Sequence, residues 1–252
     1  MTQQVVATPS LSTLRAPRAL DAITRVGVVV PARDEEERIA ACLDAIARAG
    51  ARLHRSRPDI VVDVVVVLDR CVDGTEAVVR SAGLVPLTAE GGVGTARAAG
   101  AQHAIARARA AGVGDRALWL ASTDADSEVP EHWLQVHVEL AESGLDAVFG
   151  TVEPSGASPA VLAEWRRRHC LAEGHPYVHG ANLGVRAATY RAAGGYPPLA
   201  RDEDVTLVAS IKSTSPRWVA TDRCRVASSG RLEARCVGGF ADYLGALVRE
   251  VG

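Results

Sequence analysis

Two aspartates separated by one residue, Asp124 and Asp126, directly follow the apolar run ALWLAS (117–122). Carboxylates at the lip of a buried strand are costly unless something polar or positive lies between them. Solvent, a neighbouring arginine, or a divalent metal ion carrying a substrate could each fill that position. A D-x-D pair alone is usually a surface turn, so the neighbouring segments must decide between these possibilities.

Other residues capable of chemistry also follow apolar runs. The segment PARDEE begins at Pro31, LDRCVD contains Asp69, and the glycine-rich segment GGVGTARAAG contains Arg97. Farther along the chain, RDEDVTL places Glu203 and Asp204 behind a Gly-Gly-Tyr-Pro turn. The glycine-rich segment does not match G-x-G-x-x-G and follows the third apolar run, so it does not predict a dinucleotide site.

The elements that must position these residues alternate along the chain. Continuous β-branched runs, typical of strands buried on both faces, are each followed by helical periodicity. This alternation predicts an α/β fold with a mostly parallel central sheet covered by helices on both faces. In such a sheet ligands bind beyond the carboxyl ends of the strands, where the polar segments lie. The predicted strands cover residues 26–30, 60–69, 84–88, 117–122 and 146–154, and the turn in HPYVHGANLGV leads into a further strand.

Composition excludes several other functions. The 252 residues carry a net charge of −2 at pH 7 and 4% aromatic residues, which predicts neither nucleic-acid binding nor attraction to an anionic membrane. No apolar run reaches the roughly 18 residues of a transmembrane segment, and the N-terminus lacks the apolar core of a signal peptide. The five cysteines form no C-x-x-C pair, which favours reduced thiols in a cytoplasmic protein.

The motifs together resemble the family 2 glycosyltransferases of the GT-A (Rossmann-like) fold, over roughly residues 26–215. The segments VVVPARDEEERI, VVVLDRCVDGT, GGVGTARAAG, STDADSEVP, HGANLGVR and RDEDVTL occur in the order that this family shows. The resemblance implies transfer of one sugar from a nucleotide diphosphate donor to a hydroxyl acceptor. It also implies inversion at the sugar and a Mg²⁺ or Mn²⁺ ion as cofactor.

On the donor side, the resemblance assigns base binding to the segment after the first strand and to the end of the second strand. Pro31 and Ala32 would wrap the base mainly with their backbone, with Arg33 and Glu35 nearby. Asp69 would accept a hydrogen bond from the uracil N3–H, which favours uracil, or alternatively guanine, over adenine and hence a UDP-sugar donor. In both segments, the alternative is that the acidic residues only cap the helix or loop that follows.

The resemblance also assigns phosphate and metal contacts. Asp124 would contact the ribose or a metal-bound water, and Asp126 would ligate the metal, so that the pair, with Ala125 between, holds the ion. Arg97 would be the one obvious cation to meet base or phosphate. The alternative for Arg97 is a position on a solvated helix face.

On the acceptor side, Asp204 would be the general base, with Glu203 beside it, unless both are ordinary acids of a helix N-terminus. His179 and Asn182 resemble the segment that lines the acceptor, and Trp133 could form the floor of that site or pack in the core. His179 is the last histidine, which favours inversion, and the missing Q-x-x-R-W signature favours a single transfer over polymer extension.

The predicted organisation is a flexible N-terminal tail (1–24), a nucleotide-sugar-binding half (25–153) and a small acceptor-side half (154–252). The acceptor-side half would contain the Glu-Asp helix and a C-terminal amphipathic helix through which a homodimer could form. Two other functions stay open. A sugar-phosphate nucleotidyltransferase would need its glycine-rich loop after the first strand, where PARDEE stands. A non-catalytic sugar-nucleotide-binding subunit would suit the small acceptor-side region.

Overall fold

The computed structural model describes residues 22–231, 243–245 and 248–249. The predicted N-terminal tail therefore lies almost entirely outside the described residues. The same holds for most of the C-terminal amphipathic helix that was predicted to mediate a homodimer.

One eight-stranded sheet runs through the described part of the chain, in the order β3-β2-β1-β4-β7-β6-β8-β5. Four neighbouring pairs are parallel, whereas β7 is antiparallel to both of its neighbours and β5 is antiparallel to β8. The predicted α/β fold with a mostly parallel sheet is therefore confirmed. The strands are β1 (Arg25–Ala32), β2 (Val61–Asp69), β3 (Leu87–Ala89), β4 (Leu118–Ser122), β5 (Ser127–Glu128), β6 (Ala147–Ser155), β7 (Leu183–Arg186) and β8 (Trp218–Ser229).

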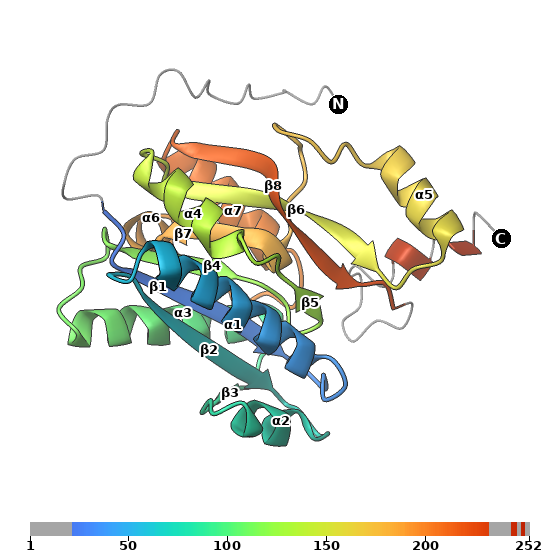
Figure 1. Ribbon diagram of the computed structural model, residues 1–252, viewed down its shortest axis with the longest axis horizontal. Helices are drawn as coiled ribbons and strands as arrows, with labels where there is room; N and C mark the ends of the chain where they lie inside the picture. Colours follow the sequence, from blue (N-terminus) through green and yellow to red (C-terminus); the bar gives the residue numbers. More distant parts are fainter. Residues whose placement is uncertain (1–21, 232–242, 246–247, 250–252) are drawn as a thin grey trace.

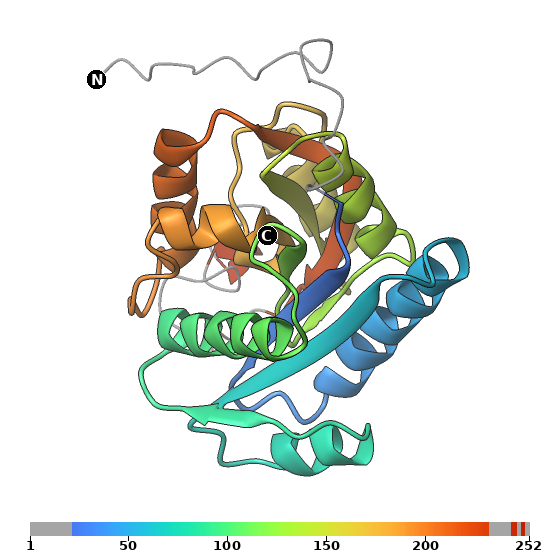
Figure 2. The ribbon, with the colours of Figure 1, turned by 90° about the vertical axis from the view of Figure 1, so that its left-hand side faces the viewer.

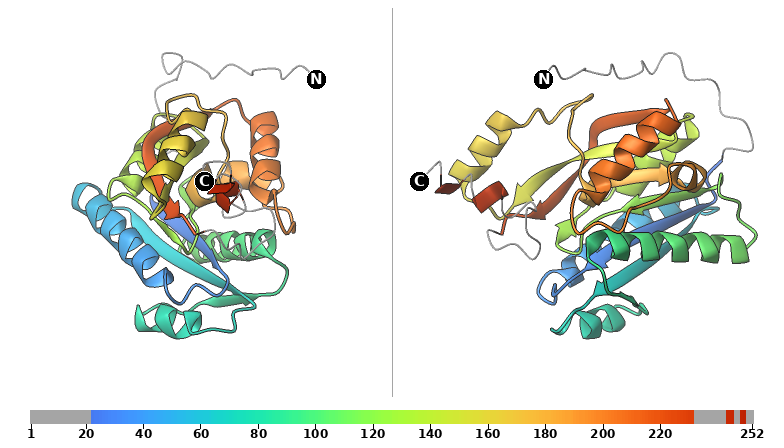
Figure 3. Two further views of the ribbon diagram at one scale, coloured as in Figure 1. Left: turned by 90° about the vertical axis from the view of Figure 1, so that its right-hand side faces the viewer. Right: turned by 180° about the vertical axis from the view of Figure 1, so that it is seen from behind.

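Helices cover both faces of the sheet. One face packs against α1, α2 and α4 and the other against α3, α6 and α7, as the edge-on view in Figure 2 and the rear view in Figure 3 show. The helices are α1 (Ile39–Ser56), α2 (Thr75–Ser81), α3 (Val93–Ala110), α4 (Trp133–Glu142), α5 (Pro159–Arg168), α6 (Ala187–Ala192) and α7 (Glu203–Thr214), with a 3₁₀ turn, η3, at Gly180–Asn182.

Alternation of side chains along each strand builds two hydrophobic cores, one on each face. In β2, Val66 and Leu68 join the core under α1 and α4, whereas Val65 and Val67 join the core under α3. Full burial of each such side chain stabilises the folded state by about 1.5–3 kcal/mol relative to leaving it exposed. The central strands are therefore apolar at most positions, which is why their pattern could be recognised in the sequence.

Two strands were not predicted. The long strand β8 reads WVATDRCRVASS, in which buried residues alternate with exposed or half-buried ones over its second half. Its polar positions interrupt the apolar run that identifies a fully buried strand. The two-residue strand β5 is too short to leave any periodic signal, and it forms only because β8 lies beside it.

Helix α5 stands beside the C-terminal described residues, away from the main layers (Figure 1). Val161 and Trp165 of α5 form a separate small cluster with Leu244, and Ala157 and Val248 pack against it. Among the described residues, no helix combines the length and the apolar character that crossing a membrane requires.

Candidate active site

A cavity of about 460 Å³ opens at the carboxyl ends of β1, β2 and β4. The parallel strands bring together the loops that follow them, which is why segments far apart in sequence meet at this edge. Asn182 and Trp133 do not reach the cavity. The predicted residues that line it are Pro31, Ala32, Arg33, Glu35, Asp69, Arg97, Asp124, Ala125, Asp126, His179, Glu203 and Asp204.

The loops after β1 and β2 are held together by their own side chains. Asp34 adopts a positive φ of 52° and accepts a hydrogen bond from the Val72 backbone N–H at 2.7 Å. The Glu35 N–H donates to the Thr75 hydroxyl at 2.8 Å. These contacts fix the backbone that carries Arg33 and Glu35 into the cavity. Asp34 and Glu35 therefore stabilise the conformation of this loop, and the loop holds Arg33 and Glu35 at the edge of the cavity.

Asp69 is buried at the end of β2 and holds the glycine-rich loop. Its Oδ1 atom accepts hydrogen bonds from the backbone N–H groups of Gly91 and Gly92, each at 3.2 Å. Gly92 has a φ of +86°, a conformation that glycine adopts without strain. Burial works against ionisation of Asp69, but the Gly91 and Gly92 N–H groups and Arg70 together hold its pKa below the usual value. The carboxylate therefore stays ionised and can accept further hydrogen bonds.

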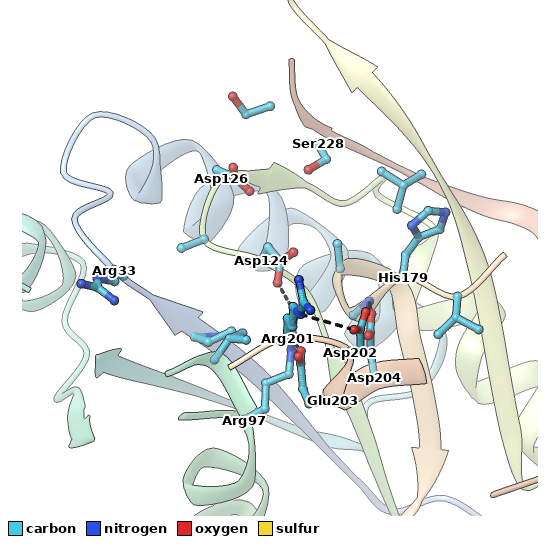
Figure 4. Close-up of a pocket in the computed structure, with 18 of the residues that line it drawn as sticks. Arg33, Arg97, Asp124, Asp126, His179, Arg201, Asp202, Glu203, Asp204 and Ser228 are labelled. Carbon is cyan, nitrogen blue, oxygen red and sulfur yellow. Dashed lines mark hydrogen bonds and ion pairs between the residues drawn. The ribbon is translucent and has the colours of Figure 1, made fainter. Parts of the chain in front are cut away.

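Arg97 is 3% exposed, so the interpretation that it lies on a solvated helix face is wrong. Its guanidinium forms ion pairs with both Asp124 and Glu203, and its Nε donates to the Ser122 hydroxyl at 3.3 Å. Gly180 lies against the same guanidinium, since a Cβ there would come within 2.4 Å of Nη2. Arg97 thus links the aspartate pair to the Glu-Asp helix, and its charge is already matched by protein carboxylates (Figure 4).

The side chain of Asp126 is more deeply buried than that of Asp124. Burial and the neighbouring charges of Asp124 and Glu35 raise the pKa of Asp126 to about 6, although Arg231 opposes the shift. Mutual repulsion between buried carboxylates is what a bound cation would relieve. Their oxygen atoms are the ligands that Mg²⁺ and Mn²⁺ prefer. The two aspartates therefore fit a hard divalent cation.

Arg231 is a cavity residue that sequence reasoning missed. It follows the end of β8, and its guanidinium pairs with Glu35 Oε1 at 2.6 Å and with Asp126 Oδ2 at 3.1 Å. The exposed Arg201 also lines the cavity. Arg97 is therefore not the one cation of the site, contrary to the prediction. No local pattern marks Arg231, because only the pairing of β5 with β8 brings it to the aspartates.

The two acids at the start of α7 have different surroundings. Burial raises the pKa of Glu203, while Arg97 holds its carboxylate from the other side. Asp204 is half-buried, and its Oδ2 and Oδ1 atoms accept hydrogen bonds from the N–H groups of Gly180 at 2.6 Å and Val205 at 2.8 Å. Burial lowers the pKa of His179 to about 4, against the attraction of Asp204, so this imidazole is neutral at pH 7. Both acids line the cavity (Figure 4), but Asp204 is the more exposed of the two.

Asn182 and Trp133 belong to a buried polar network behind the cavity. The Trp133 Nε1–H donates to Asn182 Oδ1 at 2.9 Å, and the Asn182 amide donates to the backbone oxygens of Thr151 at 2.8 Å and Cys224 at 2.9 Å. Both side chains are completely inaccessible to solvent. They tie α4 and the 3₁₀ turn to β6 and β8, so they support the cavity from behind.

Three aromatic side chains that the sequence did not indicate also line the cavity. Trp165 and His169 stack with ring centroids 3.5 Å apart, and Tyr243 lies perpendicular to both rings. Tyr243 is 41% exposed and therefore presents part of its ring to solvent. Because Trp165 is buried, the solvent-facing part of this cluster comes from His169 and Tyr243.

Within the described residues, Asp34, Cys71 and Asp73 form a second group whose possible ligand atoms lie within 4.8 Å of one another. Each atom already serves the loop. Asp34 accepts from Val72, Asp73 accepts from the Thr75 N–H at 3.0 Å, and the Cys71 thiol donates to a backbone oxygen at 3.4 Å. We therefore interpret these three residues as stabilising the loops after β1 and β2.

Comparison with known proteins gives one family. The sequence model described as Glycosyl transferase family 2 matches residues 27–186, more than half of the chain. Among curated proteins, the sequence search finds no match.

Several solved structures share the fold. Residues 1–349 of S. aureus TarS in complex with UDP-GlcNAc have 15% identity and a TM-score of 0.61, covering 90% of this chain and 65% of that one. Glucosyl-3-phosphoglycerate synthase from Mycobacterium tuberculosis, in complex with Mn²⁺, UDP and glucosyl-3-phosphoglycerate, has 19% identity and a TM-score of 0.53, covering 98% and 82%. The mannosyltransferase PcManGT from Pyrobaculum calidifontis, with GDP-Man and Mn²⁺, has 21% identity and a TM-score of 0.54, covering 90% and 61%. The chain thus spans less than two thirds of the TarS and PcManGT structures.

Proposed function

Because the chain belongs to glycosyl transferase family 2, we propose that it transfers a single sugar from a nucleoside diphosphate donor to a hydroxyl acceptor, with inversion and a divalent metal ion. The observation that carries this proposal is the convergence of separate acidic motifs on one cavity. Asp69, the pair Asp124 and Asp126, and Asp204 all line it, although they lie on three different loops or helix ends.

The proposed donor is a UDP-sugar. Asp69 is held ionised, and a carboxylate selects a base that offers an N–H, as uracil does at N3. Pro31, Ala32, Arg33 and Glu35 line the same side of the cavity and would enclose the base. Similar folds bind UDP-GlcNAc, UDP or GDP-Man, which supports a uracil or guanine nucleotide as donor.

The proposed metal ligand is Asp126, with Asp124 beside it. A bound Mg²⁺ or Mn²⁺ would neutralise the charge that develops on the leaving diphosphate. Similar folds contain Mn²⁺ together with UDP or GDP-Man. Arg97 acts as a positioning residue, because it holds Asp124 and Glu203 in fixed relation from within the core.

The proposed general base is Asp204. Two backbone N–H groups orient its carboxylate, and the remaining lone pairs can accept the proton of the acceptor hydroxyl. The acceptor oxygen then forms a bond to the anomeric carbon as the bond to the diphosphate oxygen breaks on the opposite side. His179 lies beside Asp204, and burial lowers its pKa to about 4, so its neutral imidazole is a weak base.

The two proposed halves of the chain share one sheet. Strands β1, β2 and β4 carry the donor loops, whereas β7 and β8 come from the acceptor-side half. Trp165, His169 and Tyr243 come from the proposed acceptor-side half of the chain, and their aromatic surface lines the cavity. We therefore place the acceptor between this surface and Asp204.

The test is release of UDP from UDP-sugars in the presence of Mn²⁺, with water as acceptor. We expect turnover in the wild type, and losses of at least about 100-fold in Asp204→Asn and in Asp126→Ala. Proton NMR of the released sugar should show the inverted anomer. Pyrophosphate release from a nucleoside triphosphate would instead indicate a nucleotidyltransferase, and tight binding without turnover a non-catalytic subunit.

A further inference from the structure

Arg231 contacts Asp126, the residue proposed to bind the divalent metal ion. Its guanidinium forms ion pairs with Asp126 Oδ2 at 3.1 Å and with Glu35 Oε1 at 2.6 Å, and it lines the cavity. It thereby bridges the loop after β1 and the loop after β4. Its side chain is 17% exposed, which leaves it accessible from the cavity.

The backbone around Arg231 fixes this contact. Strand β5 pairs with β8 so that Ser127 lies opposite Ser228, and the two hydroxyls are hydrogen-bonded at 3.0 Å. The Ser229 N–H donates to the backbone oxygen of Asp126 at 3.1 Å. The segment that carries Arg231 is thus joined directly to the segment that carries Asp126. The pairing of β5 with β8 therefore places the Arg231 guanidinium next to Asp126.

A divalent ion and Arg231 therefore compete for the same carboxylate oxygens. The ion needs oxygen atoms of Asp126, and a guanidinium on Oδ2 both covers one of them and repels a second cation. Arg97 cannot take over the role of Arg231, because it is buried between Asp124 and Glu203. Release of Arg231 from Asp126 becomes favourable when another anion is available to it, and a diphosphate is such an anion.

We infer that Arg231 is a built-in counter-cation of Asp126 that a divalent metal must displace, so that the metal binds strongly only together with a nucleoside diphosphate. This inference rests on the proposed function, since it assumes that Asp126 is the metal ligand. It assigns to Arg231 control over the order of binding. The metal and the diphosphate enter as a pair, and the empty site stays closed to free metal ions.

The test measures Mn²⁺ binding without nucleotide, by electron paramagnetic resonance of the free ion, in the wild type and in Arg231→Gln. We expect Arg231→Gln to bind Mn²⁺ at least tenfold more tightly. Arg223→Gln is the matched control, because Arg223 lies on β8, the strand that Arg231 follows, but pairs with the exposed Glu139 at 3.1 Å outside the cavity. Its Mn²⁺ affinity should equal that of the wild type.

UDP provides a second measurement on the same proteins. UDP should raise the Mn²⁺ affinity of the wild type by a factor at least tenfold larger than in Arg231→Gln, since the variant has no cation to displace. Equal or weaker Mn²⁺ binding in Arg231→Gln, or an equal gain in Arg223→Gln, would overturn the inference. If Arg231→Gln does not fold, Arg231→Lys decides. Lysine cannot bridge both acids with a planar fork, so tighter Mn²⁺ binding than in the wild type supports the inference, and equal or weaker binding contradicts it.

The two proposals fail differently. If the cavity is not a nucleotide-sugar site, UDP with Mn²⁺ binds neither the wild type nor Arg231→Gln. If only the role of Arg231 is wrong, UDP with Mn²⁺ binds both proteins, and their affinities for Mn²⁺ alone are the same.

Discussion

Replacing Arg97 by methionine should destabilise the protein far more than removal of a surface charge does. Arg97 and Glu203 are each 3% exposed, and the ion pair between them is enclosed by the core. Removing one partner of a buried pair leaves the other charge uncompensated, which costs about 3–5 kcal/mol. Asp124 contributes less to this loss, because its side chain is 36% exposed and water can replace the guanidinium.

Urea unfolding followed by circular dichroism at pH 7 measures this loss. Arg97→Met should lower the free energy of unfolding by about 3–5 kcal/mol with an unchanged m-value. The double variant Arg97→Met/Glu203→Gln should recover at least about 1 kcal/mol, because the uncompensated buried charge is then absent. A matched surface control is Arg80→Met, whose ion pair with Glu76 is exposed at both ends and should contribute less than about 1 kcal/mol.

The pH dependence has a definite sign. Burial already raises the pKa of Glu203, and removing Arg97 raises it further. A carboxyl whose folded-state pKa lies above its unfolded value favours the folded state when protonated, and this contribution is lost as the pH rises through the folded pKa. The deficit of Arg97→Met should therefore shrink as the pH falls from 7 to 5. A deficit below about 1 kcal/mol at pH 7, or no recovery in the double variant, would refute the buried bridge.

Three further predictions concern the surrounding scaffold. Asn182→Ala leaves the Trp133 indole N–H and two backbone oxygens without their partner, so it should lower the free energy of unfolding by about 2–4 kcal/mol. Calorimetry of the folded variant should give an unchanged UDP affinity, and a lost UDP affinity would place Asn182 in the donor site. Burial lowers the pKa of His137 to about 4, below the unfolded value near 6.5, so its contribution to stability is complete above pH 6.5 and is lost toward pH 4. Between pH 7 and pH 5 the wild type should therefore lose about 2 kcal/mol that His137→Gln does not lose, and identical pH profiles of the two proteins in urea unfolding would contradict this. In Gly94→Ala the added Cβ would lie 2.4 Å from the Pro197 carbonyl oxygen, so the melting temperature should fall, whereas Gly50→Ala, with no atom within 4 Å of its Cβ, should raise it. A melting temperature of Gly94→Ala equal to that of the wild type would show that the segment around Pro197 moves aside without loss of stability.

The central strands and the place of the site were predictable because both depend on local patterns. A strand buried on both faces is apolar at most positions, and polar residues at its carboxyl end stand out against that background. Asp69 and the pair Asp124 and Asp126 were therefore found from the sequence, and the structure brings them to one cavity. The family motifs added Glu203 and Asp204, which enter the same cavity from a helix far along the chain.

The parts that sequence reasoning missed depend on contacts between distant segments. Helix α3 packs through small residues, and a Cβ at Gly100 would come within 2.5 Å of Val29, so its buried face does not stand out as an apolar stripe. The burial of Arg97 on that face was invisible for the same reason. Strand β8 carries polar residues on its partly exposed positions, and Arg231 reaches Asp126 only through the pairing of β8 with β5. Asn182 was placed in the acceptor site because its motif resembles that segment, but its side chain points into a buried network.

The central claim is that Asp126 holds a cation for a nucleoside diphosphate in this cavity. Titration calorimetry of UDP in the presence of Mn²⁺, on the wild type, Asp126→Ala and the nearby exposed control Glu128→Ala, tests it most directly. The account predicts binding to the wild type and to Glu128→Ala, and an affinity for Asp126→Ala that is at least about 10-fold lower, a difference of about 1.4 kcal/mol. Equal UDP affinity in all three proteins with Mn²⁺ present, or no UDP binding to the wild type, would contradict it.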